Sequence, residues 1–315
     1  MIKTLIMPVV LQGALLLLLA PLVSGFIKKL KANLQMRRGP PMIQPFFDIT
    51  KLLRKGMVIS EHASWIFRAA PYVVFLTAFS VGLMLPLVST EVPLSFFGGI
   101  LAIIYLLALG RFFLALAGLD TASAFGGMGS SREMTISAIA EPAMMLSIFT
   151  VAIVAGSTSL SEISRVAINQ EWRLLSPSHI LACVAMFIVL IAETGRIPVD
   201  NPATHLELTM IHEAMVLEYS GSYLALIEWA ASIKQLILMT LLINVFFPFG
   251  LSAHWGVLSI SISLLWFIAK LLILSGLVVL VETTNAKLRL FRVPDLLSIA
   301  FVLAALALVS MFLFH

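Results

Sequence analysis

Uncharged stretches long enough to cross a bilayer recur along the whole chain. A spanning helix needs about 20 predominantly apolar residues, and six stretches supply them, at residues 4–27, 69–90, 92–110, 142–161, 174–192 and 296–315. A longer uncharged stretch, 235–269, is interrupted at Phe247-Pro248-Phe249-Gly250, so it predicts two helices, the second ending near Leu280. The pattern predicts an all-α polytopic membrane protein with about eight transmembrane helices, because each helix satisfies its own backbone hydrogen bonds in lipid.

The composition excludes an ordinary soluble domain. Hydrophobic residues make up 60% of the 315 residues and charged residues 11%, whereas soluble domains carry about 25% charged residues. Neither an internal repeat nor a polar domain interrupts the pattern. We expect a single integral membrane domain, residues 1–315, with inner loops at about 28–68 and 194–227.

Lysine and arginine fall mainly on one side of the predicted spans. If the spans alternate in direction, fourteen of these residues lie on the side of the 28–68 loop and three lie opposite. Cytoplasmic loops carry such an excess, so we expect a multi-pass protein of the cytoplasmic membrane with both termini outside. The net charge of +4 does not indicate a nucleic-acid partner, because the basic residues lie between apolar stretches.

The first inner loop combines a basic turn with an amphipathic segment. Arg37 and Arg38 precede Gly39-Pro40-Pro41, and residues 46–55 then place apolar side chains at helical spacing with basic ones between them. Such a segment predicts a helix lying in the membrane interface. The loop is either an anchor that touches only lipid headgroups or a surface that docks a partner.

The second inner loop gathers seven acidic or imidazole side chains within 26 positions. They are Glu193, Asp200, His205, Glu207, His212, Glu213 and Glu218. Carboxylates crowded near a low-dielectric boundary exchange protons near neutral pH, which a proton relay requires. A solvated acidic loop that balances the basic one fits the pattern equally well. The spacing of the histidines is seven and not the four of a helical zinc pair, so we predict no metal site.

Charged residues also lie within or beside the predicted spans. Glu141 follows Arg132 and Glu133 and precedes Pro142, while Arg111, Glu228, Lys234, Lys270 and Glu282 lie in comparable places. An ionisable group at the bilayer centre costs at least about 2.5–3.5 kcal/mol, so it faces a partner or a wet cavity. Glu141 is therefore a candidate relay carboxylate, with a structural ion pair as the alternative.

Two motifs in the inner loops resemble the subunit 1 (H subunit) family of respiratory complex I. The first is Gln35-x-Arg37-x-Gly39-Pro40 followed by Gln44-Pro45-x-x-Asp48-x-x-Lys51-Leu52, and the second is Glu193-x-x-Arg196-x-Pro198-x-Asp200 followed by Glu207-Leu208 and Glu218-Tyr219-Ser220-Gly221. Arg132 and Glu141 also match, and the resemblance covers nearly the whole chain. His205, His212-Glu213 and the shorter first loop look like the hydrogenase-4 component C and formate hydrogenlyase branch of group 4 [NiFe] hydrogenases.

The resemblance implies a non-catalytic membrane-anchor and energy-coupling subunit. Its partners would be antiporter-like membrane subunits and a peripheral arm of hydrogenase large, small and iron–sulfur subunits, which hold the [NiFe] site and the [4Fe–4S] clusters. This chain would bind no cofactor itself, because its single cysteine, Cys183, cannot supply the four thiolates of a cluster.

The same resemblance implies roles for individual residues. Those expected to dock the arm are Arg37, Arg38, Asp48, Lys51, Arg132 and Arg196. Those expected to carry proton movements are Glu141, Glu193, Asp200, His205, Glu207, Glu213, Glu218 and Glu228. Two alternatives stay open at this point: a quinone-site subunit of NADH:quinone oxidoreductase, and a stand-alone transporter or channel.

Overall fold

The structure is almost entirely helical. The computed structural model describes residues 2–90, 99–169, 176–200, 210–252 and 256–313, and within them β-structure is limited to two isolated bridges. The helices, in chain order, are α1 (Ile2–Leu34), α2 (Gln44–Leu53), α3 (Trp65–Met84), α4 (Ile100–Asp120), α5 (Ala124–Ala155), α6 (Leu160–Asn169), α7 (Pro177–Glu193), α8 (His212–Val216), α9 (Gly221–Phe246), α10 (Val257–Thr284), η3 (Leu290–Arg292) and α11 (Val293–Leu313).

The all-α membrane fold predicted from the sequence is confirmed. In the described part of the chain, seven helices are long and apolar enough to span a membrane: α1, α3, α4, α5, α9, α10 and α11. The remaining predicted span corresponds to α7, an apolar helix of 17 residues, which is at the short end of the range for a spanning helix. The predicted interfacial helix corresponds to α2.

Three helices extend well beyond the boundaries that the uncharged stretches predicted. α4 continues past Arg111 to Asp120, α5 begins at Ala124 instead of 142, and α9 begins at Gly221 instead of 235. The additional turns carry charged side chains that pair with charges on neighbouring helices. Because these pairs offset the cost of burying charge, a charged residue did not mark the end of a helix here.

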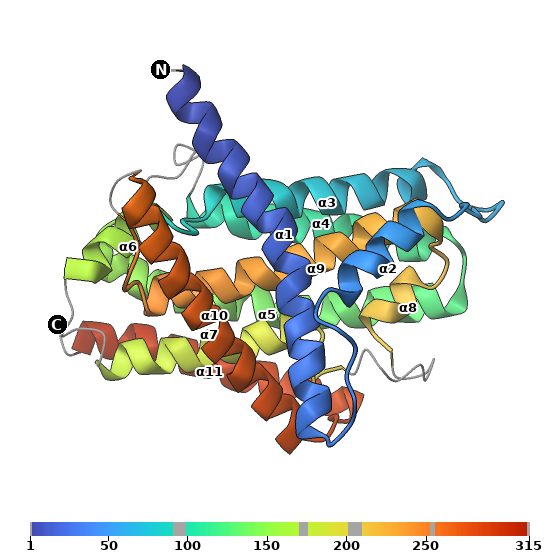
Figure 1. Ribbon diagram of the computed structural model, residues 1–315. Helices are drawn as coiled ribbons and strands as arrows, with labels where there is room; N and C mark the ends of the chain where they lie inside the picture. The colour runs from blue at the N-terminus through green and yellow to red at the C-terminus, as the bar shows by residue number, and fades with distance from the viewer. Residues whose placement is uncertain (1, 91–98, 170–175, 201–209, 253–255, 314–315) are drawn as a thin grey trace.

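Six helices form the body of the bundle, and two cross it obliquely. Figure 1 shows α3, α4, α5, α7, α9 and α11 running roughly side by side, with α1 and α10 inclined across them. α3 packs on α4 and α9, while α11 packs on α5 and α7. At the right of the view lie α2 and α8. We refer to the surface formed by α2, α8 and residues 35–43, 54–64 and 194–200 as the basic end.

Small residues bring α4 and α5 into close contact beside the basic end. A Cβ atom at Gly126 would lie 2.3 Å from the carbonyl oxygen of Gly118, so the two backbones touch directly. The Ser130 hydroxyl donates to the carbonyl oxygens of Ala115 (2.9 Å) and Gly126 (2.8 Å). Helices in membranes commonly associate through such small residues and hydroxyl groups.

The junction between α9 and α10 explains the intramembrane Lys270. The Lys270 Nζ donates to the carbonyl oxygens of Phe247 (2.8 Å) and Phe249, which follow the last turn of α9. A cation is favourable at the C-terminal end of a helix, where the helix dipole is negative and the last carbonyls lack partners. This contact closes the helix end at the predicted break in the 235–269 stretch.

We predict that Gly126→Ala destabilises the bundle, because its methyl group would overlap the backbone of α4. Overpacking of this kind costs about 1–3 kcal/mol, which should lower the midpoint of thermal unfolding of the detergent-solubilised protein. Gly127→Ala is the matched control, since its Cβ would meet only Leu119 at 3.9 Å. Equal midpoints for the two variants would contradict the close contact of α4 and α5.

Candidate functional site

Arg111, on α4, is the centre of a buried ion-pair cluster. Its side chain is 5% exposed; Nη1 lies 2.8 Å from Oε1 of Glu141 and Nη2 lies 2.7 Å from Oε2 of Glu193. Glu133 approaches Nε at 3.8 Å, and Lys234 binds Glu193 at 2.8 Å. The five side chains come from α4, α5, α7 and α9, so this cluster joins four helices of the bundle.

The Arg111 cluster contains one more carboxylate than it has cations. In their usual charge states, Arg111 and Lys234 carry two positive charges, and Glu133, Glu141 and Glu193 carry three negative ones. Uncompensated charge is costly in the low-dielectric interior, so one proton on a carboxylate would bring the cluster to neutrality. Glu141 has the most accessible of the three carboxylates, with a side chain 30% exposed against 15% for Glu133 and 3% for Glu193.

A second polar cluster surrounds Glu282 at the end of α10. Lys31 lies 2.9 Å from Oε2 and Arg196 lies 2.8 Å from Oε1 of this carboxylate, whose side chain is 2% exposed. Arg196 also donates to Oε1 of Gln235 (2.8 Å), which accepts a further bond from Ser24 (3.1 Å). The Glu282 cluster thereby ties α1, α9 and α10 to the segment after α7.

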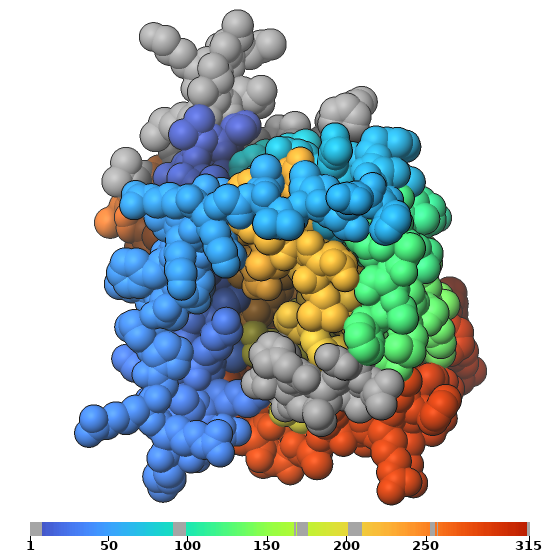
Figure 2. Space-filling model, turned by 90° about the vertical axis from the view of Figure 1, so that its right-hand side faces the viewer, coloured from blue at the N-terminus to red at the C-terminus, as the bar shows by residue number. Residues whose placement is uncertain are grey.

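A cavity of about 390 Å³ lies beside both clusters. Arg111, Glu193, Lys234, Arg196 and Gln235 contribute to its wall. Further charged lining comes from Lys28, Asp48, Glu213 and Glu228, and apolar lining includes Val74, Leu107 and Leu224. Figure 2 faces the basic end and shows a hollow between α2 and α9. The cavity places water-accessible carboxylates of α8 and α9 next to the buried Arg111 cluster.

Asp200 anchors the second inner loop to the segment that follows α10. Its Oδ1 lies 2.7 Å from Nζ of Lys287, and its Oδ2 accepts a hydrogen bond from the backbone N–H of Ile211 at 3.1 Å. The backbone N–H of Leu288 also donates to the carbonyl of Pro198 at 2.8 Å. Asp200 is 3% exposed, so it is a buried connector that also contributes to the cavity wall.

Tyr219 aligns the beginning of α9 with the beginning of α3. Its ring stacks on Phe67 with centroids 4.0 Å apart, and its hydroxyl donates to the Phe67 carbonyl at 2.9 Å. Burial, together with the nearby Asp120 and Tyr223, raises the pKa of the Tyr219 phenol well above its usual value. The phenol therefore stays neutral and keeps its proton for this bond.

The predicted relay residues fall into three groups in the structure. Glu141 and Glu193 meet in the Arg111 cluster, whereas Asp200, Glu213 and Glu228 line the cavity. Glu218 is exposed beyond α8, and it belongs neither to the Arg111 cluster nor to the lining of the cavity. His205 and Glu207 lie outside the described residues. Their roles stay predictions.

The predicted docking residues are divided between the surface and the interior. Arg37, Arg38 and Lys51 are exposed at the basic end, and Asp48 lies at the cavity mouth, where it accepts from Gln44 (2.9 Å). Arg132 is half-buried and donates to the Met210 carbonyl at 2.9 Å, and Arg196 is held inside the Glu282 cluster. Arg37, Arg38, Lys51 and Asp48 are therefore exposed charges, whereas Arg132 and Arg196 are held by contacts within the protein.

The sequence did not assign a central role to Arg111, Glu282, Lys31 or Gln235. Arg111 and Glu282 were recognisable as charges within or beside apolar stretches, which requires a partner. The partners themselves are far away in the chain: Glu193 lies 82 positions from Arg111 and Arg196 lies 86 positions from Glu282. Lys31 and Gln235 carried no local signal of this kind.

The family model described as NADH dehydrogenase matches residues 6–314. The chain belongs to this NADH dehydrogenase family. Within the family it is 36% identical to hydrogenase-4 component C and 34% identical to formate hydrogenlyase subunit 4, both of Escherichia coli strain K12. These alignments cover 94% and 96% of this chain and 92% and 97% of the two relatives.

More distant members of the family include the H subunits of NADH-quinone oxidoreductase. The one from Paraburkholderia phymatum is 27% identical over 83% of this chain and 77% of its own length. Among solved structures, a chain of the archaeal membrane-bound sulfane sulfur reductase has the same fold, with a TM-score of 0.86 at 19% identity, covering 98% of this chain and 99% of that chain. The resemblance to the hydrogenase-4 and formate hydrogenlyase branch is confirmed.

We predict that Arg111→Leu strongly destabilises the protein, because it leaves buried carboxylates without their cation. Breaking a buried ion pair from one side costs about 3–5 kcal/mol. Arg165→Leu is the control, since the Arg165–Glu162 pair is exposed (side chains 55% and 46% accessible) and such pairs contribute about 0–1 kcal/mol. The measurement is the thermal midpoint of each variant in mild detergent. Similar midpoints would show that the Arg111 cluster is not a structural constraint.

Proposed function

We propose that this chain is the membrane-anchor and energy-coupling subunit of a complex I-like membrane-bound hydrogenase. The observation that carries the proposal is the buried Arg111 cluster, which lies directly beside a water-accessible cavity near the basic end. Membership of the family and the identity to hydrogenase-4 component C and formate hydrogenlyase subunit 4 support this reading.

The basic end is proposed to face the cytoplasm and to dock the peripheral arm. Arg37, Arg38 and Lys51 are exposed there, and in the described part of the chain no salt bridge engages them. Positive charge on this side agrees with the usual orientation of cytoplasmic loops. Exposed arginines are suited to pairing with carboxylates on a partner, because the guanidinium binds them through two parallel hydrogen bonds.

Coupling would proceed through changes in protonation. An iron–sulfur cluster in the arm would add negative charge when reduced, and Asp200, Glu213 and Glu228, which line the cavity, are the carboxylates proposed to respond by taking up a proton. A proton gained or lost at the cavity alters the balance of charge around Glu193. Arg111 bridges Glu193 to Glu141 within 3 Å on each side, so Glu141 would bind or release its proton in response.

The alternative is a quinone-site subunit of an NADH-quinone oxidoreductase. The cavity favours it, since its size and its mixture of apolar and charged lining suit an apolar ligand with a polar head. The 27% identity to an H subunit is consistent with it. Inhibitor-sensitive quinone reduction by the purified complex would establish this alternative over the hydrogenase.

We expect Glu141→Gln to uncouple ion transport from electron transfer. The amide is similar in size but cannot bind and release a proton, so the ions moved per hydrogen formed should fall several-fold while hydrogen evolution continues. The measurement is ion uptake into membrane vesicles alongside the evolution rate. Glu162→Gln is the control, because Glu162 forms an exposed pair on α6. Normal coupling in Glu141→Gln would mean that Glu141 is a structural residue only.

A double reversal, Arg37→Glu with Arg38→Glu, should release the peripheral arm. Like charges placed opposite an acidic surface repel it, so affinity purification through a tag on this chain should recover the antiporter-like subunits without the cluster-bearing arm. Arg165→Glu reverses a charge on α6, away from the basic end, and should leave the complex intact. An arm retained by the double variant would contradict docking at Arg37 and Arg38.

The unmodified tagged chain provides the reference for this experiment. Antiporter-like subunits together with an arm and hydrogen evolution would support the hydrogenase proposal. Recovery of an arm without hydrogenase activity would indicate a different complex I relative in place of the hydrogenase. A chain that purifies alone would favour a stand-alone transporter.

A further inference from the structure

A shallow groove of about 540 Å³ lies where α3 and α9 begin. It is formed by Ala63, Ser64, Trp65, Arg68, Tyr72 and Tyr223, together with Ala69. None of these residues lines the cavity beside the Arg111 cluster. The groove therefore needs an explanation of its own, which the coupling role does not supply.

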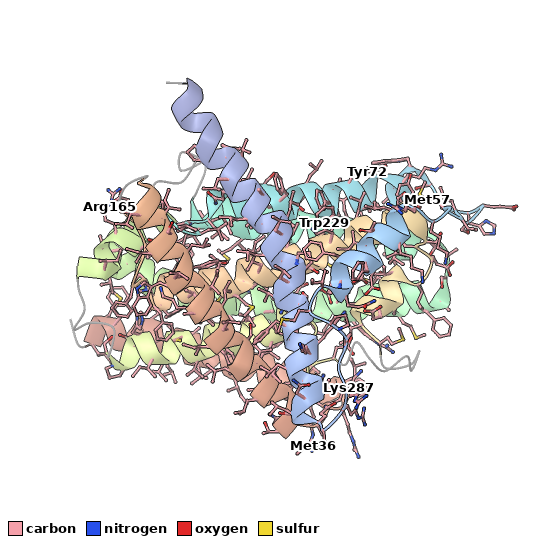
Figure 3. All side chains as sticks on the ribbon, viewed as in Figure 1. Met36, Met57, Tyr72, Arg165, Trp229 and Lys287 are labelled. Carbon is pink, nitrogen blue, oxygen red and sulfur yellow. The ribbon has the colours of Figure 1, made fainter. Side chains whose placement is uncertain are left out.

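The aromatic residues of the groove are arranged along one face of α3. Trp65, Arg68 and Tyr72 follow at helical spacing, and Trp65 and Tyr72 are 69% and 52% exposed. Tyr72 meets Tyr223 of α9 edge to face, with centroids 5.9 Å apart, and Figure 3 places Tyr72 on the outside of the bundle. Exposed Trp and Tyr at the end of a spanning helix are typical of the headgroup level of a bilayer.

Arg68 provides a positive charge within this aromatic surface. Its side chain is exposed, and in the part of the chain that the structure describes no salt bridge engages it. The neighbouring Asp120 directs its Oδ2 to the backbone N–H groups of Ser64 (2.8 Å) and Phe67 (3.3 Å), and among the described residues it forms no salt bridge with Arg68. An arginine at the edge of an apolar span is stabilised by an anion at the interface.

Ser64 adds a second polar group beside Arg68. Its Oγ accepts from the backbone N–H of Ile66 at 3.2 Å, and a serine hydroxyl that accepts one bond can still donate its own proton. The groove thus combines a guanidinium and a hydroxyl with flanking aromatic rings. About 10 Å along the helix separates Trp65 from Tyr72 at 1.5 Å per residue, enough for a headgroup and the first part of an acyl chain.

We propose that this groove is a binding site for an anionic phospholipid. Arg68 and Ser64 hold its phosphate, while Trp65, Tyr72 and Tyr223 contact the glycerol and upper acyl chain. The lipid bridges α3 and α9, and it adds to the Tyr219–Phe67 contact that aligns the same two helices. The site depends on the membrane orientation of the fold and not on which redox reaction the complex performs.

The test measures thermal stability of the full chain in mild detergent with added lipid. Dioleoylphosphatidylglycerol should raise the midpoint by about 2–4 °C, as expected for a ligand in roughly fivefold excess over its Kd, and dioleoylphosphatidylcholine should raise it much less. Arg68→Gln should remove most of the difference between the two lipids, and Arg68→Lys should retain part of it. Arg292→Gln is the matched control, because Arg292 is exposed with no salt bridge in the described residues.

Each other outcome overturns the proposal in a defined way. If the two lipids still differ in Arg68→Gln as they do in the unmodified protein, the groove is not the lipid site. If inorganic phosphate raises the midpoint as much as dioleoylphosphatidylglycerol does, the groove binds free anions and not a lipid. Should Arg68→Gln itself be unstable, Tyr72→Ala offers a second variant that leaves the charge in place and should also weaken the lipid effect. A partner helix seated over Tyr72 in the assembled complex would exclude lipid from the groove. The thermal measurement requires neither hydrogenase nor transport activity, so it tests the lipid site independently of the proposed coupling role.

Discussion

The charge of Arg111 is the constraint on which the arrangement of the central helices depends. An arginine whose side chain is only 5% exposed among apolar helices must have its charge compensated by the protein itself. The compensation comes from Glu133 and Glu141 on α5 and Glu193 on α7, with Lys234 of α9 completing the cluster. Close contact between α4 and α5 at Gly118 and Gly126 brings these side chains within reach. Packing and charge pairing therefore specify the same relative placement of four helices.

The Glu282 cluster extends this arrangement to the two oblique helices. Lys31 and Arg196 share its carboxylate, and Gln235 links Arg196 to Ser24 of α1. Lys234 and Gln235 are adjacent in α9, so one turn of this helix contributes to both clusters. A change of charge at the cavity can for this reason influence two sets of contacts: one within the bundle body, and one that holds α1 and α10 against it.

The fold was largely predictable from the sequence, whereas the partners in the site were not. Apolar stretches separated by basic loops are local signals, and they gave the all-α class, the approximate number of spans and the interfacial helix at 46–55. Helix boundaries were wrong for α4, α5 and α9, because a local rule treats Arg111, Glu141 or Lys234 as a polar boundary unless its partner is known. That partner lies on another helix, tens of positions away, and only the folded arrangement identifies it. Motif resemblance supplied Glu141 and Glu193 but not the arginine that joins them.

Arginines near the basic end differ in function because they differ in what faces them. Arg196 faces Glu282 and Gln235 inside the bundle, and its charge is already used to hold helices together. Arg37 and Arg38 extend into solvent beyond α1, where a partner protein can reach them. Arg68 lies between these extremes, on a spanning helix among exposed aromatic rings. A buried cation is balanced by its own chain, a solvated one is available to another protein, and one at the interface is most readily balanced by lipid phosphate. The sequence shows all four as equivalent basic residues, and the distinction arises from what the fold places opposite each of them.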